Sequence, residues 1–563
     1  MTPTYQPEIE RKYEVPEGAA PRWQELPRLR VEAEPQIRGL EAAYFDTASG
    51  RLADFGVALR RRRGGPDEGW HLKFREGGLK REVHVPLLKT ADRLPAQMRQ
   101  LVSGLLGREE LVALAAVRTQ RQVLEVHDPE HGRVAEICLD EVCGTEQSTG
   151  ITRAWQEYEV ELVNGTDADG RAVFDEIEAV LLEAGLTPSS SSAKIARTLG
   201  AEDDAPAVTL TGPDGEPVEA PGAPATTAES SDGKKDKKSK KDKKAGKKAE
   251  QDGRRTGEKD DGPAMGPEPS VDETVRELVR GSVDEVLWIE FILRVGGDEA
   301  IHRLRSAVRR SEALILGLLP DLADPEAGAQ VLEQLRDLSQ QLSAARDAEV
   351  VVEELPGRAE AVGPAVSRSA LAHLLSLARQ GRESTAASAT RLLSGTRHRA
   401  VTVSLRDWAL EARLNPEAAQ LSPKKLGSRM FQRWLDGVLE IGPVPPELQD
   451  LDAVLAHVHR VRREMRLLHF GTQTFETSAL RARKSQLALL EGTQGYLEAC
   501  GELMDSVVLD TWCAAAARSL IRSGGDRYGV GVLHGRERAL LQARGEDSVL
   551  ILEELFDRLG DTD

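Results

Sequence analysis

The sequence predicts a multidomain α+β protein: a strand-rich N-terminal domain, a linker and an all-helical C-terminal domain. Residues 1–200 contain short stretches in which polar and apolar side chains alternate, as they do in strands. Helical patterns interrupt them near 92–107 and 171–185. Residues 201–271 lose this periodicity and are rich in Pro, Gly and Lys, which is typical of a disordered linker. Residues 272–563 are rich in Leu, Ala, Arg and Glu with a helical period, and we expect only helices there.

Length, composition and charge narrow the class of protein. The 563 residues leave room for two to four domains of about 100–200 residues each. The net charge of −18 repels polyanions unless basic groups are concentrated locally, so we expect no nucleic-acid partner. No apolar run reaches the ~18 residues that span a bilayer, and the N-terminus lacks the apolar core of a signal peptide. We therefore expect a cytoplasmic protein without a membrane partner, and its oligomeric state stays open.

Carboxylates alternate along the first and last predicted strands of the N-terminal domain. In "PEIERKYEV", residues 7–15, two carboxylates and the ammonium group of Lys12 share one strand face, because side chains two residues apart point the same way. "EYEVEL" places three further carboxylates on one face, and "ICLDEV" adds another. The acidic members of these rows are Glu8, Glu10, Asp140, Glu157, Glu159 and Glu161.

Basic side chains alternate in the same way along the strands between. They are Arg60, Arg62, His71, Lys73, Arg75, Arg118 and Arg121. Such rows fit either an open sheet whose charged face is solvated, or a closed barrel lined with charge and covered outside by apolar packing. In a closed barrel, clustered carboxylates need a cation, and oxygen-only ligands favour Mg²⁺ or Mn²⁺ over zinc. The basic rows would then accept phosphate groups.

Five motifs in order make residues 5 to about 200 resemble the CYTH domain, whose members are the triphosphate tunnel metalloenzymes. "EIERK" is similar to the Glu-x-Glu-x-Lys signature of that family. It is followed by Leu-Arg-x-Arg at 59–62, a Lys-bearing strand at 70–75, the acidic strand at 157–161 and "SSAKIAR" around Lys194.

The resemblance implies an eight-stranded antiparallel β-barrel tunnel with flanking helices that binds a triphosphate and Mg²⁺ or Mn²⁺. The implied phosphate-binding residues are Lys12, Arg60, Arg62, Lys73, Arg75, Arg118 and Lys194. The implied metal ligands are Glu8, Glu10, Asp140 and members of the row Glu157, Glu159 and Glu161, with Glu159 the first choice in that row. We assign catalysis to Glu8, Glu10, Lys12 and Lys73, with water as the nucleophile, since phosphoryl transfer depends chiefly on positioning and charge stabilisation.

The helical half contains an internal duplication. "AIHRLRSAVRRSE" and "HVHRVRREMRLLHF" each place Arg three residues and a basic residue seven residues after a His, at an offset of 157 residues. At about 100° per residue, these offsets lie within about 60° of one helix face, opposite the apolar positions. Two such basic stripes, if the halves pack about a pseudo-twofold axis, would merge into one groove for a polyanion. The stripe residues are His302, Arg305, Arg309, Arg310, His459, Arg462, Arg466 and His469.

The segment from about 285 to 560 resembles the CHAD domain, which implies two related helical bundles that bind inorganic polyphosphate. The first half fits the family pattern through His302-x-x-Arg305 and through Arg346-Asp347. The second half departs from it, because Met504-Asp505 lacks the preceding Arg and His469-Phe470 replaces Arg-Tyr.

Between the two domains, residues 234–248 hold ten Lys and two Asp, a net charge of +8. A basic tether and a cationic arm that attracts polyphosphate both remain open, and the domain combination resembles bacterial proteins rather than eukaryotic ones, which disfavours nuclear import. Together these features predict a metal-dependent hydrolase of inorganic triphosphate or polyphosphate that associates with polyphosphate granules. A non-catalytic polyphosphate-binding protein and an adenylate cyclase are the alternatives.

Overall fold

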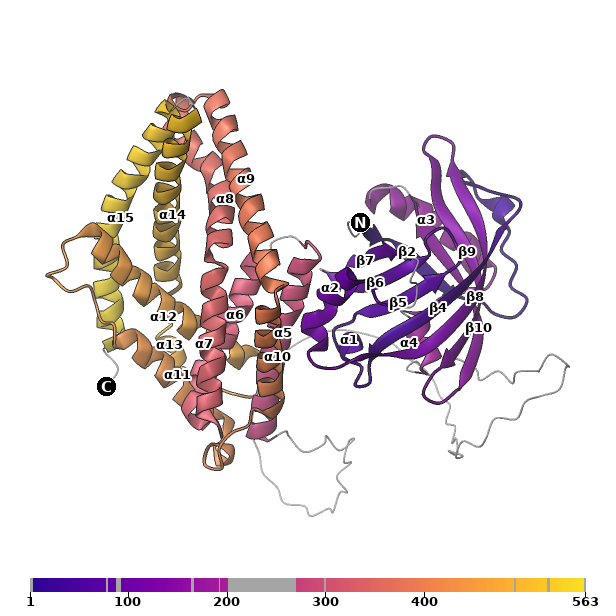
Figure 1. Ribbon diagram of the computed structural model, residues 1–563, viewed down its shortest axis with the longest axis horizontal. Helices are drawn as coiled ribbons and strands as arrows, with labels where there is room; N and C mark the ends of the chain where they lie inside the picture. The colour runs from indigo at the N-terminus through magenta and orange to yellow at the C-terminus, as the bar shows by residue number, and fades with distance from the viewer. Residues whose placement is uncertain are drawn as a thin grey trace, which may run out of the picture. The chain divides into compact units, whose positions relative to one another are not determined.

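The computed structural model describes residues 4–76, 79–87, 93–163, 167–191, 193–200, 270–297, 300–490, 493–523 and 527–560 (Figure 1). The strand-rich and the helical domain are described separately below. The predicted linker, 201–271, lies outside the described residues except for its last two residues, and the Lys-rich run lies outside them entirely. Within the described ranges, every helix is too short or too polar to cross a membrane.

The strand-rich domain is an antiparallel sheet that closes on itself. Its strands are β1 (Thr4–Glu8), β2 (Glu10–Glu14), β3 (Arg30–Val31), β4 (Gln36–Thr47), β5 (Ala58–Arg63), β6 (Gly69–Glu76), β7 (Leu79–Pro86), β8 (Leu111–Asp128), β9 (Gly132–Glu146), β10 (Thr152–Leu162) and β11 (Thr187–Pro188). They follow the order β1-β7-β6-β5-β4-β8-β9-β10-β2-β11, with β3 beside β8.

Closure depends on the first strand, which is interrupted at Ile9. Its first part, β1, pairs with β7, and its second part, β2, pairs with β10, so the two edges of the sheet are joined by one stretch of chain. With β1 and β2 counted as one strand beside β4 to β10, the ring has eight long strands. The predicted antiparallel tunnel is confirmed, but its strand count differs from the predicted eight: the described residues form eleven strands, because the first strand is divided and the short strands β3 and β11 are added.

Apolar side chains cover the outside of this ring because they alternate with the charged ones. Tyr158 and Val160 on β10 belong to an apolar core with Phe174 and Ile177 of α3 (Asp167–Glu183). Leu72 on β6 belongs to another apolar core, together with residues of α1 (Arg51–Asp54) and α2 (Ala96–Leu106). The charged positions of the same strands therefore face the lumen.

The short helix α4 (Lys194–Thr198) lies near one end of the ring. Its Ile195, with the following Leu199, packs against a buried cluster that includes Tyr44, Val117 and Trp155. Arg197 adds an ion pair with Glu14 at 2.8 Å, and its guanidinium lies 5.1 Å from the Trp155 ring centroid. These contacts fix the position of α4 and of the lysine at its first residue.

The helical domain is formed by helices of 5 to 33 residues, most of them long (Figure 1). They are α5 (Val271–Arg294), α6 (Ala300–Leu318), α7 (Pro325–Gln341), α8 (Ser343–Val362), α9 (Arg368–Leu393), α10 (Thr396–Glu411), α11 (Pro423–Leu439), α12 (Leu451–Thr477), α13 (Lys484–Ala488), α14 (Thr493–Ser523) and α15 (Tyr528–Gly560). The duplicated motifs lie on α6 and α12, which pack against each other. The aspartates that follow the motifs, Asp347 and Asp505, lie on α8 and α14, which also pack against each other. Contact between equivalent elements is what a pseudo-twofold axis produces.

Candidate functional site

The ring of strands encloses a cavity of about 350 Å³ whose wall is mostly charged. Its basic lining residues are Lys12, Arg38, Arg60, Arg62, Lys73, Arg75, Lys80, Arg121 and Lys194. Its acidic lining residues are Glu10, Asp67, Glu82, Glu136, Glu159 and Glu161. The basic groups therefore outnumber the carboxylates by nine to six, and the cavity suits an anionic ligand.

Most residues that we proposed from the sequence for the tunnel line this cavity. Asp140 and Glu157 lie directly beside the lining residues, with side chains 0% and 4% exposed. Glu8 is placed only by its backbone, which pairs with Lys80 of β7; its side chain lies outside the described residues. Arg38, Lys80, Glu82 and Glu136 were not among the proposed residues, although each has an inward position in its strand.

The prediction for Arg118 has to be corrected. Its side chain is 83% exposed on the outer face of β8, where its Nε lies 3.7 Å from Glu41. Arg121 lines the cavity instead, because residues an odd number apart on a strand point to opposite faces. The cross-strand register, which pairs Arg121 with Asp140, identifies the inward arginine.

Three carboxylates deep in the wall, Asp140, Glu157 and Glu159, form what we call the carboxylate triad. Lys194 places its Nζ 2.9 Å from Asp140, 2.5 Å from Glu157 and 2.6 Å from Glu159. The guanidinium of Arg121 donates to both oxygens of Asp140, at 2.7 and 2.6 Å, and also to Glu159. Lys12 donates to Glu159 as well. The triad is thus matched by three cations in a closed network.

These ion pairs determine the protonation states in the network. Burial opposes the ionisation of Glu159, but Lys12, Lys194 and Arg121 together hold the pKa of Glu159 well below its ordinary value. Burial also opposes the charged form of Lys194, yet the triad carboxylates raise the pKa of that lysine well above its ordinary value. Both groups are therefore charged at neutral pH.

A second set of carboxylates, which we call the carboxylate row, follows the strands at one level. Cross-strand partners run from Glu125 to Glu136, from Glu136 to Glu161 and from Glu161 to Glu10. Lys80 donates to Glu10 at 2.8 Å. Burial works against the ionisation of Glu10, but neighbouring ammonium groups, Lys12 foremost, hold the pKa of Glu10 below its ordinary value. The row therefore places carboxylates on four adjacent strands, β8, β9, β10 and β2.

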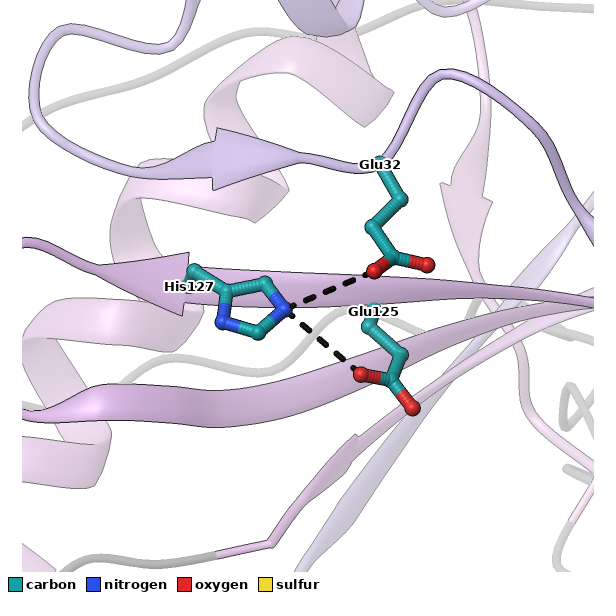
Figure 2. Close-up of side chains that lie close together, drawn as sticks. All are labelled: Glu32, Glu125 and His127. Atoms are coloured by element: carbon teal, nitrogen blue, oxygen red, sulfur yellow. Dashed lines mark ion pairs between the residues drawn. The ribbon is translucent and has the colours of Figure 1, made fainter.

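At one end of the row lies a cluster that the sequence reasoning did not find (Figure 2). The Nε2 atom of His127 lies 3.8 Å from Glu32 and 3.5 Å from Glu125, and one ligand atom from each residue lies within 4.8 Å of the others. His127 and Glu32 are 42% and 43% exposed, and the guanidinium of Arg133 is 3.5 Å from Glu125. This exposure and the competing guanidinium are typical of a surface ion-pair cluster.

The duplicated stripes of the helical domain come together. The apolar positions behind them, Ile301, Leu304 and Val308 on α6 and Val458, Val461 and Met465 on α12, are all buried. This burial points the basic positions of both helices away from the core. Burial and the neighbouring arginines Arg462, Arg309, Arg305 and Arg346 lower the pKa of Arg466 to about 10.

The same arginines act on His459, whose pKa is lowered by burial first and then by Arg462 and Arg309. Guanidinium groups from α6, α8 and α12 thus repel one another in one place. We call Arg305, Arg309, Arg346, Arg462 and Arg466 the arginine cluster. Such a concentration of positive charge is relieved by a bound polyanion.

Besides His459, three of the predicted stripe residues are not members of this cluster. Arg310 lies about 80° around α6 from His302 and forms an ion pair with Glu285 on α5. His469 lies beside Phe470, with ring centroids 6.4 Å apart. His302 is exposed and lines a cavity of about 680 Å³ together with Arg346 and Arg382.

Comparison with known proteins gives one family match in the strand-rich domain and another in the helical domain. The CYTH domain family model matches residues 6–196, and the CHAD domain family model matches residues 282–514. The chain joins a CYTH domain to a CHAD domain. It is 27% identical, over 374 residues, to an uncharacterized protein of Mycobacterium tuberculosis found in two strains. The match covers 64% of this chain, and the chain spans about six-tenths (61%) of that relative's length.

Several solved structures are similar to one part of the chain. PptA from Streptomyces chartreusis is 19% identical with a TM-score of 0.39, covering 51% of this chain and 100% of that one. The CHAD domain from Ricinus communis is 18% identical with a TM-score of 0.40, covering 54% and 98%. A putative adenylyl cyclase from Hippeastrum, described as having a dominant triphosphatase activity, is 22% identical with a TM-score of 0.22, covering 35% and 96%.

The CYTH family implies a divalent metal, and the donor chemistry of the tunnel fits one. The carboxylate row and the triad offer only oxygen ligands, which is the preference of Mg²⁺ and Mn²⁺. In the row, Glu10 and Glu161 are cross-strand partners on adjacent strands. In the triad, one oxygen from each carboxylate lies within 4.8 Å of the others.

Proposed function

We propose that the chain is a metal-dependent phosphohydrolase that cleaves inorganic triphosphate or polyphosphate in the CYTH tunnel. One observation carries the proposal: nine basic side chains and six carboxylates line one cavity of about 350 Å³. A triphosphate needs several cationic donors along its length, and the carboxylates supply ligands for its counter-ion.

Each group has a role that follows from its position. Arg60, Arg62, Lys73 and Arg75 on β5 and β6 would bind and orient the phosphate oxygens. Glu10 and Glu161 would hold Mg²⁺ or Mn²⁺, which when bound neutralises phosphate charge and acidifies water. Lys12 donates to Glu159 and lies 3.6 Å from Glu10, so it would hold the ligand Glu10 in place and stabilise charge on the substrate. Because positioning and charge stabilisation suffice for phosphoryl transfer, water serves as the nucleophile.

We further propose that the CHAD domain binds inorganic polyphosphate through the arginine cluster. The cluster gathers guanidinium groups from three helices, and burial together with the neighbouring guanidiniums lowers the pKa of Arg466 there. Polyphosphate offers charge at every unit along a flexible chain and so fits the cluster. As part of this proposal, the protein lies in the cytoplasm and associates there with polyphosphate granules.

Parallel assays test the reaction. The purified chain, with Mg²⁺ or Mn²⁺, is offered triphosphate, long-chain polyphosphate, ATP and thiamine triphosphate, and orthophosphate is measured. We expect release from the first two, abolished by chelation and by the double substitution Glu10→Gln/Glu161→Gln. Glu41→Gln is the matched control, because Glu41 is 66% exposed on the outer face of β4. Cyclic AMP formed from ATP would replace the proposal by a cyclase, and polyphosphate binding without release would replace it by a binding protein.

A further inference from the structure

The ammonium group of Lys194 occupies the centre of the carboxylate triad. Its Nζ lies 2.9 Å or less from one oxygen of Asp140, Glu157 and Glu159, and the ligand oxygens of the three lie within 4.8 Å of one another. A divalent cation bound by this triad would need the same oxygens. The lysine therefore stands in the position that a second metal ion would take.

We propose that Lys194 is a built-in cation that closes the triad to metal, so that the tunnel holds one divalent ion, at Glu10 and Glu161. The inference depends on the proposed function in one respect: the ion at Glu10 and Glu161 is the one that serves the proposed hydrolysis.

Charge balance supports this assignment. The three carboxylates of the triad are matched by three cations, Lys12, Arg121 and Lys194, all within ion-pair distance. A divalent ion added to this set would leave a surplus of two positive charges in a site whose side chains are 0–13% exposed. Uncompensated charge at such burial is strongly disfavoured. In the carboxylate row, Glu161 has a carboxylate as cross-strand partner on both sides, while Glu10 contacts Lys80 at 2.8 Å and shares Lys12 with the triad.

Packing also keeps the lysine in place. The helix that carries it is fixed by Ile195 and Leu199 in the apolar cluster. Arg153 donates to the carbonyl of Thr198 at 2.6 Å. Gly144 provides the space for Thr198, because a Cβ at that glycine would lie 2.2 Å from the threonine Oγ1. With its backbone anchored at these points, Lys194 is a permanent part of the wall rather than a mobile arm.

The experiment counts Mn²⁺ ions bound to the full chain, without phosphate, from the electron paramagnetic resonance signal of the free ion. All variants carry Glu32→Gln, so that the exposed cluster of Figure 2 does not contribute. We expect one tunnel ion in this background, lost on Glu161→Gln. Lys194→Met should gain one ion, and Lys194→Arg, which keeps the charge, should gain none. Lys194→Met/Glu161→Gln should then bind one.

Two results would overturn the inference: a second ion in the background protein that survives Glu161→Gln, or no gain on Lys194→Met in a chain with unchanged circular dichroism. The first needs no lysine variant, so it applies even if Lys194→Met fails to fold. Orthophosphate release is measured on the same samples. Release with two bound ions would sink the inference and leave the proposed function standing, whereas one ion without release would do the reverse.

Discussion

Replacing Arg121 by Ala should locally destabilise the tunnel wall, because two buried carboxylates would lose their main partner. Arg121 makes a bidentate contact with Asp140, whose side chain is fully buried, and donates to Glu159, whose side chain is 7% exposed. Removing one partner of a buried ion pair costs about 3–5 kcal/mol. Lys12 and Lys194 still contact Glu159, and Lys194 still contacts Asp140, so we expect the lower end, about 3 kcal/mol.

Amide hydrogen exchange is the appropriate measurement, because it reports local stability in one domain of a multidomain chain. A loss of about 3 kcal/mol corresponds to roughly a hundredfold loss of protection. We expect it for amides of β8, β9 and β10, with no change in the helical domain. Arg118→Ala is the matched control, since that arginine on the same strand is 83% exposed and its ion pair is worth about 1 kcal/mol or less.

A second substitution separates the ion pair from general damage. Arg121→Met/Asp140→Leu replaces both partners by apolar groups, and such replacements of a buried pair are often nearly neutral. Protection should therefore recover in part relative to Arg121→Ala, with Glu159 still balanced by its two lysines. If Arg121→Ala and Arg118→Ala lose the same protection, the buried network does not stabilise the wall as argued.

The remaining predictions concern pH, polyanion binding and packing. Folding lowers the pKa of Glu10 and of Glu159. The ionised side chains therefore stabilise the folded tunnel above the ordinary carboxyl pKa of about 4.3, and this contribution is lost as the pH falls through the lower, folded-state pKa. Protection of the β10 amides from hydrogen exchange, measured across pH, should drop only below about pH 4. Arg466→Ala should weaken polyphosphate binding about tenfold and reduce its salt dependence by about one charge in calorimetric titrations, while Arg429→Ala on α11 should not. Gly144→Ala should displace α4, seen as increased exchange of its amides, because the new Cβ would overlap Thr198; unchanged exchange would contradict the tight fit.

Alternation along strands was enough to predict the tunnel, because period two requires only local sequence. It correctly separated Arg60, Lys73 and Glu159, which line the cavity, from Leu72 and Tyr158, which face outward. It did not set the phase of β8, where the run contains basic residues of both parities. Choosing Arg121 over Arg118 required the register with β9, which is a long-range property of the folded sheet.

The partner of Lys194 was beyond sequence reasoning for a different reason. A lysine in a phosphate-binding family pattern suggests a phosphate contact, but nothing local shows that α4 folds back against the wall. The contact joins residues 35 to 54 positions apart, and it forms because Ile195 and Leu199, both partly buried, pack against the cluster around Trp155. Apolar packing thus decides which ions a charged side chain meets.

In the helical domain, packing compensates for an asymmetry that the sequence shows between the duplicated halves. Met504 stands where the first half has Arg346, and its sulfur lies 3.3 Å from His459. Taken without the first half, the basic stripe on α12 would lack the cation that Arg346 supplies to the stripe on α6. Because α6 and α12 pack together, however, Arg346 from the first half is among the groups that act on Arg466 of the second. The two stripes therefore share one set of guanidiniums, and a polyanion spanning both halves should lose affinity on substitution in either half.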